Sequence, residues 1–235
     1  MISVVIPAYN EEKSIAKALK ALASQITKEK FEVVVVDNNS TDRTSKEVLK
    51  FKDKLNLRLV LEKKKGRGAA RARGFKEAKG DIVMSTDADA EVPPDWIENL
   101  VSNLRESDAI AVTGSCRIND CGFVTNKVFN FVQPKFMRIY KFGLGHFWLS
   151  GYNFAIYKDA YKKSGGFDPA LNAQEDIDIS FKAAKVGKIK FVPSATVLFS
   201  GRRFKGGFLK GTMPYVTTYL SYFLFKKDIS LPDIR

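Results

Sequence analysis

The first half of the chain alternates between short apolar runs and amphipathic segments with a helical period. The runs predict five strands, at residues 2–6, 31–36, 57–61, 81–85 and 109–113. The segments predict four helices, at residues 11–26, 42–51, 67–78 and 94–105. Asn10 stands where the N-cap of the first helix is expected. Strands that alternate with helices predict an α/β fold in which helices flank a mainly parallel central sheet.

The second half departs from this pattern. Residues 121–158 contain no Asp or Glu and are rich in aromatic and basic residues. A helix is predicted over residues 174–186 and a strand over residues 190–192, and acidic residues are again absent from residues 200–227. We therefore expect one domain over residues 1–204 that carries an aromatic and basic insertion, followed by an aromatic and basic tail over residues 205–235.

Composition indicates a folded, basic protein. The 235 residues are 45% hydrophobic and 28% charged, which is typical of a globular domain. The excess of 39 basic over 26 acidic residues favours polyanionic partners such as nucleotides, nucleic acid or anionic lipid, although a solvated lysine-rich surface explains it equally well. No stretch has the pattern of a signal peptide or a transmembrane helix, so we expect a cytoplasmic protein, with peripheral contact to the inner face of the cell membrane as an open alternative.

Cysteine and histidine are too few to explain a function. Cys116 and Cys121 do not make a disulfide framework, and we expect two reduced thiols, with a local disulfide as the alternative. A zinc site needs more ligands than these thiols and the single histidine, His146, provide. We expect His146 to be a hydrogen-bonded loop residue.

Acidic residues stand at the ends of two predicted strands. Asp37 closes the second strand, and Asp87 and Asp89 follow the fourth. Ligands bind at the carboxyl ends of strands in an open parallel sheet. Because residues i and i+2 of an extended chain point the same way, Asp87 and Asp89 can converge on Mg²⁺ or Mn²⁺ together with substrate phosphates. On their own, such acids are also typical of solvated loops, and Asp37 can simply cap the next helix.

The order and spacing of several motifs resemble those of family 2 glycosyltransferases, which have the GT-A fold. The matching stretches are V-V-I-P-A-Y-N-E-E at 4–12, V-V-V-V-D-N-N-S-T-D at 33–42, G-R-G-A-A-R-A-R-G at 66–74, A-K-G-D at 78–81, S-T-D-A-D at 85–89, G-G-F-D at 165–168 and Q-E-D-I-D at 174–178. The resemblance covers about residues 2–204. It implies a single GT-A-type domain that binds the nucleotide sugar through residues 1–118 and the acceptor through residues 119–204.

The resemblance also implies a role for each matching residue. It implies nucleotide-sugar binding by Pro7, Ala8, Tyr9, Glu11, Asp37, Arg71 and Asp87. It makes Asp89 the principal metal ligand, with Asp87 beside it, for Mn²⁺ or Mg²⁺. It makes Asp176 the catalytic base, and the acceptor-binding residues are expected to be Trp148, Gly151, Asn153 and Glu175.

The implied reaction moves a sugar from a nucleoside diphosphate, UDP or GDP, to a hydroxyl group of a saccharide or a lipid-linked acceptor. The acceptor hydroxyl is a poor nucleophile until a base such as Asp176 removes its proton. A metal and nearby arginines stabilise the departing diphosphate. One base on the face opposite the leaving group gives inversion, so no second nucleophilic carboxylate is required.

Three features depart from the family pattern. Ser200 stands where many relatives have a histidine ligand for the metal. Arg202 and Arg203 follow it, and they either bind the diphosphate, since guanidinium groups match phosphate oxygens, or form a basic surface turn. The Q-x-x-R-W motif of processive polymerases is absent, which favours transfer of one sugar per encounter.

The aromatic and basic segment at residues 207–225 suits a membrane interface, packing against the domain, or self-association. Our hypothesis is a lipid-linked acceptor at the cytosolic membrane face. A nucleotidyltransferase that forms sugar nucleotides is an alternative, but it is expected to show a Gly-rich signature where this chain has P-A-Y-N-E-E. A nucleic-acid-binding module is suggested by charge alone, and we expect no nucleic acid partner. A catalytically silent scaffold is a further alternative.

Overall fold

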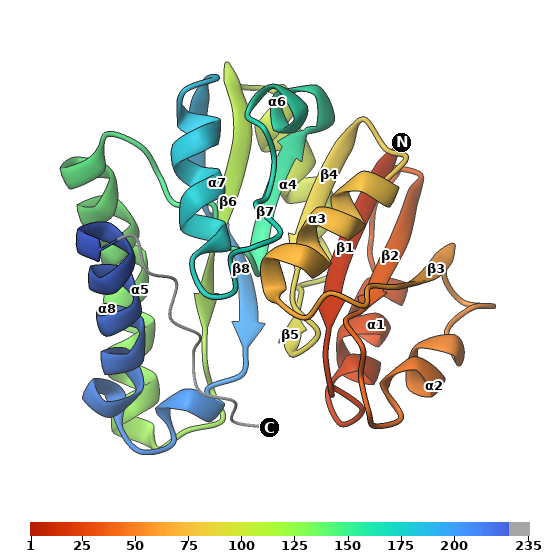
Figure 1. The fold of residues 1–235 in the computed structure, drawn as a ribbon, viewed down its shortest axis with the longest axis horizontal. Coiled ribbons are helices and arrows are strands. Elements are labelled where there is room, and N and C mark those ends of the chain that lie inside the picture. Colours follow the sequence, from red (N-terminus) through yellow and green to blue (C-terminus); the bar gives the residue numbers. More distant parts are fainter. Residues whose placement is uncertain (226–235) are drawn as a thin grey trace.

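The computed structural model describes residues 1–225, within which eight strands form one mixed sheet (Figure 1). The strand order is β3-β2-β1-β4-β7-β6-β8-β5. The strands are β1 (Ile2–Ala8), β2 (Phe31–Asp37), β3 (Leu57–Leu61), β4 (Ile82–Thr86), β5 (Ala90–Glu91), β6 (Ala109–Arg117), β7 (Asn153–Tyr157) and β8 (Lys188–Phe199). Strands β3, β2, β1 and β4 are parallel neighbours, as are β6 and β8, whereas β7 runs antiparallel between β4 and β6. The sheet is therefore mixed and mostly parallel, which agrees with the α/β prediction.

Helices cover both faces of the sheet. They are α1 (Ile15–Ala23), α2 (Thr44–Leu49), α3 (Arg67–Glu77), α4 (Trp96–Arg105), α5 (Phe123–Leu144), α6 (Lys158–Lys163), α7 (Glu175–Ala184), the 3₁₀ helix η1 (Arg202–Phe204) and α8 (Phe208–Phe225). Helices α1, α2 and α4 contribute to one hydrophobic cluster, and α3, α6 and α7 to the cluster on the opposite face. In Figure 1, α5 and α8 lie together at one side of the molecule, at the far end from β3.

The central strands explain the continuous apolar runs of the sequence. Val4 belongs to the cluster on one face of the sheet and Val5 to the cluster on the other, and neither side chain is exposed. A strand with helices on both faces needs apolar side chains at every position rather than at alternate ones. The five strands predicted in the first half are all present, with ends that differ by up to four residues.

The start of the first helix was predicted four residues too early. Helix α1 begins at Ile15, and Ser14 rather than Asn10 is the residue at its N-cap. Asn10 has a left-handed backbone with φ +52°, and its side-chain oxygen accepts a hydrogen bond of 2.8 Å from the backbone N–H of Thr41. Asn tolerates this conformation better than most residues do, and the bond joins the loops after β1 and β2.

The second half contains elements that the sequence did not predict. Helix α5 is rich in Phe and Val and contains Pro134, so its composition does not favour a helix. Strand β7 is a five-residue run, and its antiparallel place between β4 and β6 is foreign to an alternating β-α pattern. Strand β8 extends from Lys188 to Phe199, well beyond the three residues predicted.

The tail packs on the domain as far as the structure describes it. Helix α8 contacts η1 and α5, and the predicted tail residues 226–235 lie outside the described residues. In the part of the chain that the structure describes, no helix has the length and apolar character needed to cross a membrane. Cys116 and Cys121 are both free thiols, as expected. His146 lies in a loop, where its Nδ1 is 3.1 Å from the carbonyl oxygen of Phe147.

Candidate active site

A pocket of about 590 Å³ opens where the parallel strands end. Its floor is formed by residues that follow β1 and β4, which include Tyr9, Asp87 and Asp89. One wall comes from the start of α7, and the other walls come from α5, η1 and α8. The carboxyl ends of the parallel strands therefore meet the pocket, as the rule for open α/β sheets predicts.

Arg71 is buried in this site, and its guanidinium group bonds four of the surrounding residues. Its Nη2 donates to Asp87 at 2.6 Å, and its Nη1 donates to the Ser85 hydroxyl at 2.5 Å and to the Gly151 carbonyl at 2.8 Å. Its Nε reaches the carboxylate of Glu175 at 3.4 Å. The Arg71 side chain is only 3% exposed, so these partners compensate its charge in the interior. The guanidinium thereby ties α3, the end of β4, the loop before β7 and α7 together.

Gly151 fits against this arginine because it has no side chain. A Cβ at this position would lie 2.6 Å from Arg71 Nη2, closer than packing allows. The small residue lets the Gly151 carbonyl reach the guanidinium while its N–H donates to Asp176 Oδ2 at 3.3 Å. The sequence prediction that Gly151 belongs to the site is thus matched by its position in the pocket lining.

Two acids begin helix α7. Glu175 and Asp176 occupy its first turn, where the helix dipole favours negative charge. Burial raises the pKa of Asp176 to about 7, the charge of Glu175 adds to the rise, and Arg71 opposes it. Burial also raises the pKa of Glu175, against the opposing effect of Arg71. A carboxylate with a pKa near neutrality suits proton abstraction at neutral pH.

Asp89 is held beside Arg202 and Glu11. Arg202 Nη2 lies 2.9 Å from Asp89 Oδ2 and donates to Glu11 Oε1 at 2.8 Å. Burial raises the pKa of Asp89 to about 7, and the charge of Asp87 adds to the rise, while Arg202 lowers it. Burial acts to lower the pKa of Arg202, but the hydrogen bond to Glu11 and the charge of Asp89 raise it overall. Arg202 therefore lines the pocket and pairs with two of its acids.

The donor set at this corner fits a divalent cation only in part. Within residues 1–225 no group of three or more His, Cys, Asp or Glu side chains is arranged to hold a metal. Asp87 and Asp89 are close enough for the negative charge of Asp87 to raise the pKa of Asp89. A bound cation would reduce this repulsion between the two carboxylates. Mg²⁺ in proteins is often bound by one or two carboxylates, with substrate phosphates completing its shell. Asp87 and Asp89 could therefore hold such a cation only if substrate phosphates completed its shell.

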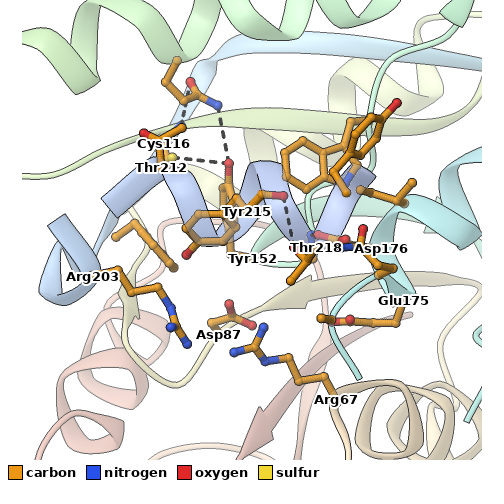
Figure 2. Close-up of a pocket in the computed structure, with 18 of the residues that line it drawn as sticks. Arg67, Asp87, Cys116, Tyr152, Glu175, Asp176, Arg203, Thr212, Tyr215 and Thr218 are labelled. Carbon is orange, nitrogen blue, oxygen red and sulfur yellow. Dashed lines mark hydrogen bonds between the residues drawn. The ribbon is translucent and has the colours of Figure 1, made fainter. Parts of the chain in front are cut away.

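Arginines surround the same corner. Figure 2 shows Arg67 and Arg203 on different sides of Asp87, both directed into the pocket. The pKa of Arg203 is lowered, mainly by burial. Tyr215 acts to raise this pKa, whereas the positive charges of Arg67 and Arg202 act to lower it. Cations that repel one another in a buried pocket favour an anionic ligand, and guanidinium groups match phosphate oxygens in particular.

Two predicted site residues do not line the pocket. The carboxylate of Asp37 accepts hydrogen bonds from the backbone N–H of Ser40, at 2.9 Å, and from the hydroxyl of Ser45. Asn153 is fully buried, and its amide joins the indole of Trp96 to the carbonyls of Ser115 and Ala195. Asp37 therefore braces the loop into α2, and Asn153 links β7 to α4 and β8 inside the core.

The other predicted site residues lie around one pocket. The pocket lining includes Pro7, Ala8, Tyr9, Glu11, Arg71, Asp87, Asp89, Trp148, Gly151, Glu175, Asp176, Arg202 and Arg203. Ser200, in the place of the family histidine, also lines it, and its hydroxyl donates to Asp120 at 3.3 Å.

The sequence reasoning missed several lining residues. Tyr152 follows Gly151, and its hydroxyl lies 3.3 Å from the Cys116 thiol (Figure 2). Tyr215 reaches the pocket from α8, and Tyr140 stacks with Trp148 at 6.2 Å between ring centroids. The dense aromatic composition of residues 121–158 was the available signal, but it did not indicate which rings face inward.

Comparison with known proteins identifies the family. The family model described as Glycosyl transferase family 2 matches residues 3–165, which is more than half of the chain. The chain belongs to glycosyl transferase family 2, as its motifs predicted. This match ends before Asp176 and Arg202, so it covers the strand-end acids but not the whole pocket.

Individual relatives agree with this family. The probable glycosyltransferase YdaM of Bacillus subtilis (strain 168) is 32% identical over 207 residues, which are 83% of this chain and 49% of that protein. The dolichol-phosphate mannosyltransferase of Pyrococcus furiosus is 34% identical over 112 residues, 47% of this chain and 32% of that protein. The chain thus spans about half, or less, of the length of these curated relatives.

A solved structure has the same fold. The structure of Staphylococcus aureus TarS 1-349 in complex with UDP-GlcNAc aligns over 85% of this chain and 58% of that chain, with a TM-score of 0.69 and 25% identity. This likeness confirms the expected single domain of the GT-A type.

Proposed function

We propose that this chain transfers a sugar from a nucleoside-diphosphate sugar to an acceptor hydroxyl, with inversion and with the help of a divalent cation. One observation carries the proposal: a single pocket holds a carboxylate with a raised pKa, Asp176, and a floor of paired acids and arginines. The structure of TarS with UDP-GlcNAc supports a nucleotide sugar as the donor. In this proposal Asp176 would be the proton acceptor, and the arginines would form the anion site.

The nucleotide sugar is proposed to bind over the strand ends. Tyr9 and Arg71 line this side, and Arg202 and Arg203 face it from η1. We assign residues 1–118 to the nucleotide-sugar half and residues 119–204 to the acceptor half, with the diphosphate between them. Asp37 would need a rearranged loop, or a further acceptor position on its carboxylate, to bind the base, because Ser40 and Ser45 already donate to it.

Mn²⁺ or Mg²⁺ is proposed to bind at Asp89, with Asp87 beside it. A cation at this position would supply positive charge against the departing diphosphate. Arg202 must then exchange its contact with Asp89 for one with phosphate oxygens, and its guanidinium is suited to both. The chain itself contributes the orientation, because Arg71 fixes Asp87 and Glu11 anchors Arg202.

Asp176 is proposed to take the proton of the acceptor hydroxyl. Gly151 N–H orients its carboxylate, and Trp148 and Glu175 line the same side of the pocket. A base on one face of the sugar and a diphosphate on the other give inversion. The lack of a processive motif supports transfer of one sugar per encounter. A saccharide or a lipid-linked hydroxyl fits the aromatic wall, and the name of the dolichol-phosphate relative supports testing the second class.

The test separates binding from turnover. Calorimetry with UDP, GDP and their sugars, with and without Mn²⁺, identifies the donor, and release of free sugar measures slow donor hydrolysis. We expect Asp176→Asn to bind the donor as the wild type does and to lose about 100-fold or more in turnover. Wild-type turnover should fall as the pH drops below about 7, because Asp176 then becomes protonated.

Asp178→Asn is the matched control, because Asp178 lies on the same helix, pairs with Lys182 and does not line the pocket. Full turnover in the Asp176→Asn variant would remove this residue from the role of base. Failure of the wild type to bind any of the nucleotides would contradict the function itself.

A further inference from the structure

Apolar side chains are exposed mainly on two helices of this protein. Among residues 1–225, α5 contributes eight of the large exposed apolar side chains and α8 contributes six, whereas the rest of the described chain contributes four. The two helices contact each other and lie on one side of the molecule (Figure 1). Exposed apolar patches of this kind mark interaction surfaces rather than ordinary solvent-facing helices.

The outward stripe of α8 has helical spacing. It consists of Leu209, Met213, Val216, Leu220 and Leu224, whose exposed fractions are 81%, 61%, 43%, 47% and 63%. The opposite side of the helix faces the protein with Gly211 and Thr218, which are buried, and with Tyr215, which lines the pocket. The inward side also carries the rings of Phe208 and Tyr215, which stack on Phe204, so α8 has apolar side chains on both sides. A helix on a water-facing surface instead has a polar outer side.

Helix α5 extends this stripe with both apolar and basic side chains. Phe131 and Phe142 are 64% and 94% exposed, and basic residues alternate with such rings along the helix. The exposed basic residues of the two helices are Lys127, Lys135, Arg138, Lys141 and Lys210. Neither helix contains an acidic residue. We call the exposed side chains of α5 and α8 the α5–α8 face.

We propose that the α5–α8 face docks on the surface of an anionic lipid bilayer. Apolar side chains enter the boundary between headgroups and acyl chains, and the lysines and arginine meet the anionic headgroups. A second copy of the chain fits this face poorly, because a twofold interface would bring two acid-free, positively charged surfaces together. A nucleic acid would satisfy the cations but would leave the apolar stripe of α8 in water.

The α5–α8 face continues into the catalytic pocket. Ile139 and Leu220 are 68% and 47% exposed, yet both also line the pocket. An acceptor with a lipid chain can therefore keep that chain in the bilayer while its polar end reaches Asp176. This part of the inference rests on the proposed function and names a membrane-anchored hydroxyl as the acceptor class.

Vesicle binding tests the docking face directly. The probes are vesicles of phosphatidylcholine with phosphatidylglycerol and vesicles of phosphatidylcholine alone, in low salt, measured by co-sedimentation. We expect wild-type protein to bind the anionic vesicles at least about tenfold more tightly. The variant Leu209→Glu with Met213→Glu should bind about 100-fold more weakly, or about tenfold for each apolar side chain lost from the bilayer.

The matched control is Ile26→Glu with Leu61→Glu. It adds the same two negative charges at apolar residues that are 73% and 56% exposed, outside the α5–α8 face. Absence of wild-type binding to anionic vesicles, or an equal loss in both variants, would overturn the proposal. A wild-type dimer in sedimentation analysis that only the Leu209 and Met213 variant dissociates would also overturn it, because the face would then bind a second copy.

The outcome can be separated from that of the proposed function. Leu209 and Met213 do not line the pocket, so UDP binding should be the same in the wild type and the variant. Loss of vesicle binding with normal UDP binding is the result that we expect for the variant. Vesicle binding by a wild type that binds no nucleotide would uphold the docking face and refute the sugar transfer.

Discussion

Replacement of Arg71 by methionine should reduce the free energy of unfolding far more than the same change elsewhere on helix α3. Methionine approximates the length of the arginine stem but provides no charge and no hydrogen-bond donors. It leaves Glu175, whose side chain is 4% exposed, without the guanidinium 3.4 Å away, and it breaks the 2.6 Å bond to Asp87. Removal of one partner from a buried ion pair costs about 3–5 kcal/mol.

That loss is large relative to the stability of a typical domain, which is about 5–15 kcal/mol. With a slope of about 2–3 kcal/mol per molar urea, the unfolding midpoint should fall by about 1–2 M. The control is Arg73→Met, because Arg73 lies on the same helix, is 40% exposed and pairs with Glu77 in the i,i+4 arrangement at 3.0 Å. Such a surface pair contributes about 0.5 kcal/mol or less, so the control midpoint should hardly move.

The loss of stability in the Arg71→Met variant should depend on pH, and its direction can be derived. Burial raises the pKa of Glu175 and of Asp176, and Arg71 lowers both, so its loss raises them further. A carboxyl whose pKa is higher in the folded state binds more protons when folded, and stability then increases as the pH falls. The gap between Arg71→Met and the wild type should therefore be smaller at pH 5 than at pH 8.

Urea unfolding at the two pH values provides both readouts. An intermediate result for Arg71→Lys, which keeps the charge but not the guanidinium fork, would support the geometric argument. The reasoning is refuted if Arg71→Met and Arg73→Met lose the same amount, or if the Arg71→Met deficit grows toward acid.

Two further substitutions test the pocket. Asp89→Ala should make the effect of Mn²⁺ on UDP affinity about tenfold smaller than in the wild type, because the proposed metal ligand is lost. Calorimetry measures the affinities, and Asp108→Ala, at an exposed ion pair, is the control. An undiminished Mn²⁺ effect would rule out Asp89 as the ligand. Gly151→Ala should cost about 1–3 kcal/mol of stability, because the new Cβ would lie 2.6 Å from Arg71 Nη2. Gly122→Ala should cost less in the same urea experiment, because a Cβ at Gly122 would meet no described atom within 4 Å. Equal losses in the two variants would contradict the argument from crowding.

The sequence was sufficient to predict the side of the pocket at the strand ends, because few physical factors decide where these residues lie. Strands buried on both faces read as continuous apolar runs, and parallel strands bring their ends together. Asp87 and Asp89 therefore could be assigned to one corner before the structure was known, and both line the pocket. Asp37 also stands at the end of a parallel strand, but it does not line the pocket. Its carboxylate oxygens instead accept hydrogen bonds from the next loop and the start of α2.

The opposite side of the pocket was much less predictable. Its walls come from α5 and α8, whose aromatic and β-branched residues do not favour helices and whose place is set by contacts with the domain. Asn153 looked like a polar residue beside the site, yet its amide is satisfied by three groups in the core. Tyr215 reaches the pocket only because α8 folds back over it, and no local pattern indicates this return.

The contacts that close the pocket also set when it can exist during synthesis. Arg202 bonds Glu11 across 191 residues, and Arg71 bonds Glu175 across 104. During synthesis, Asp87 emerges after its partner Arg71, but Asp89 emerges long before Arg202, the arginine that pairs with it. Loop closure over such separations is slow, so affinity for nucleotide should appear only after helix α8 has emerged and docked.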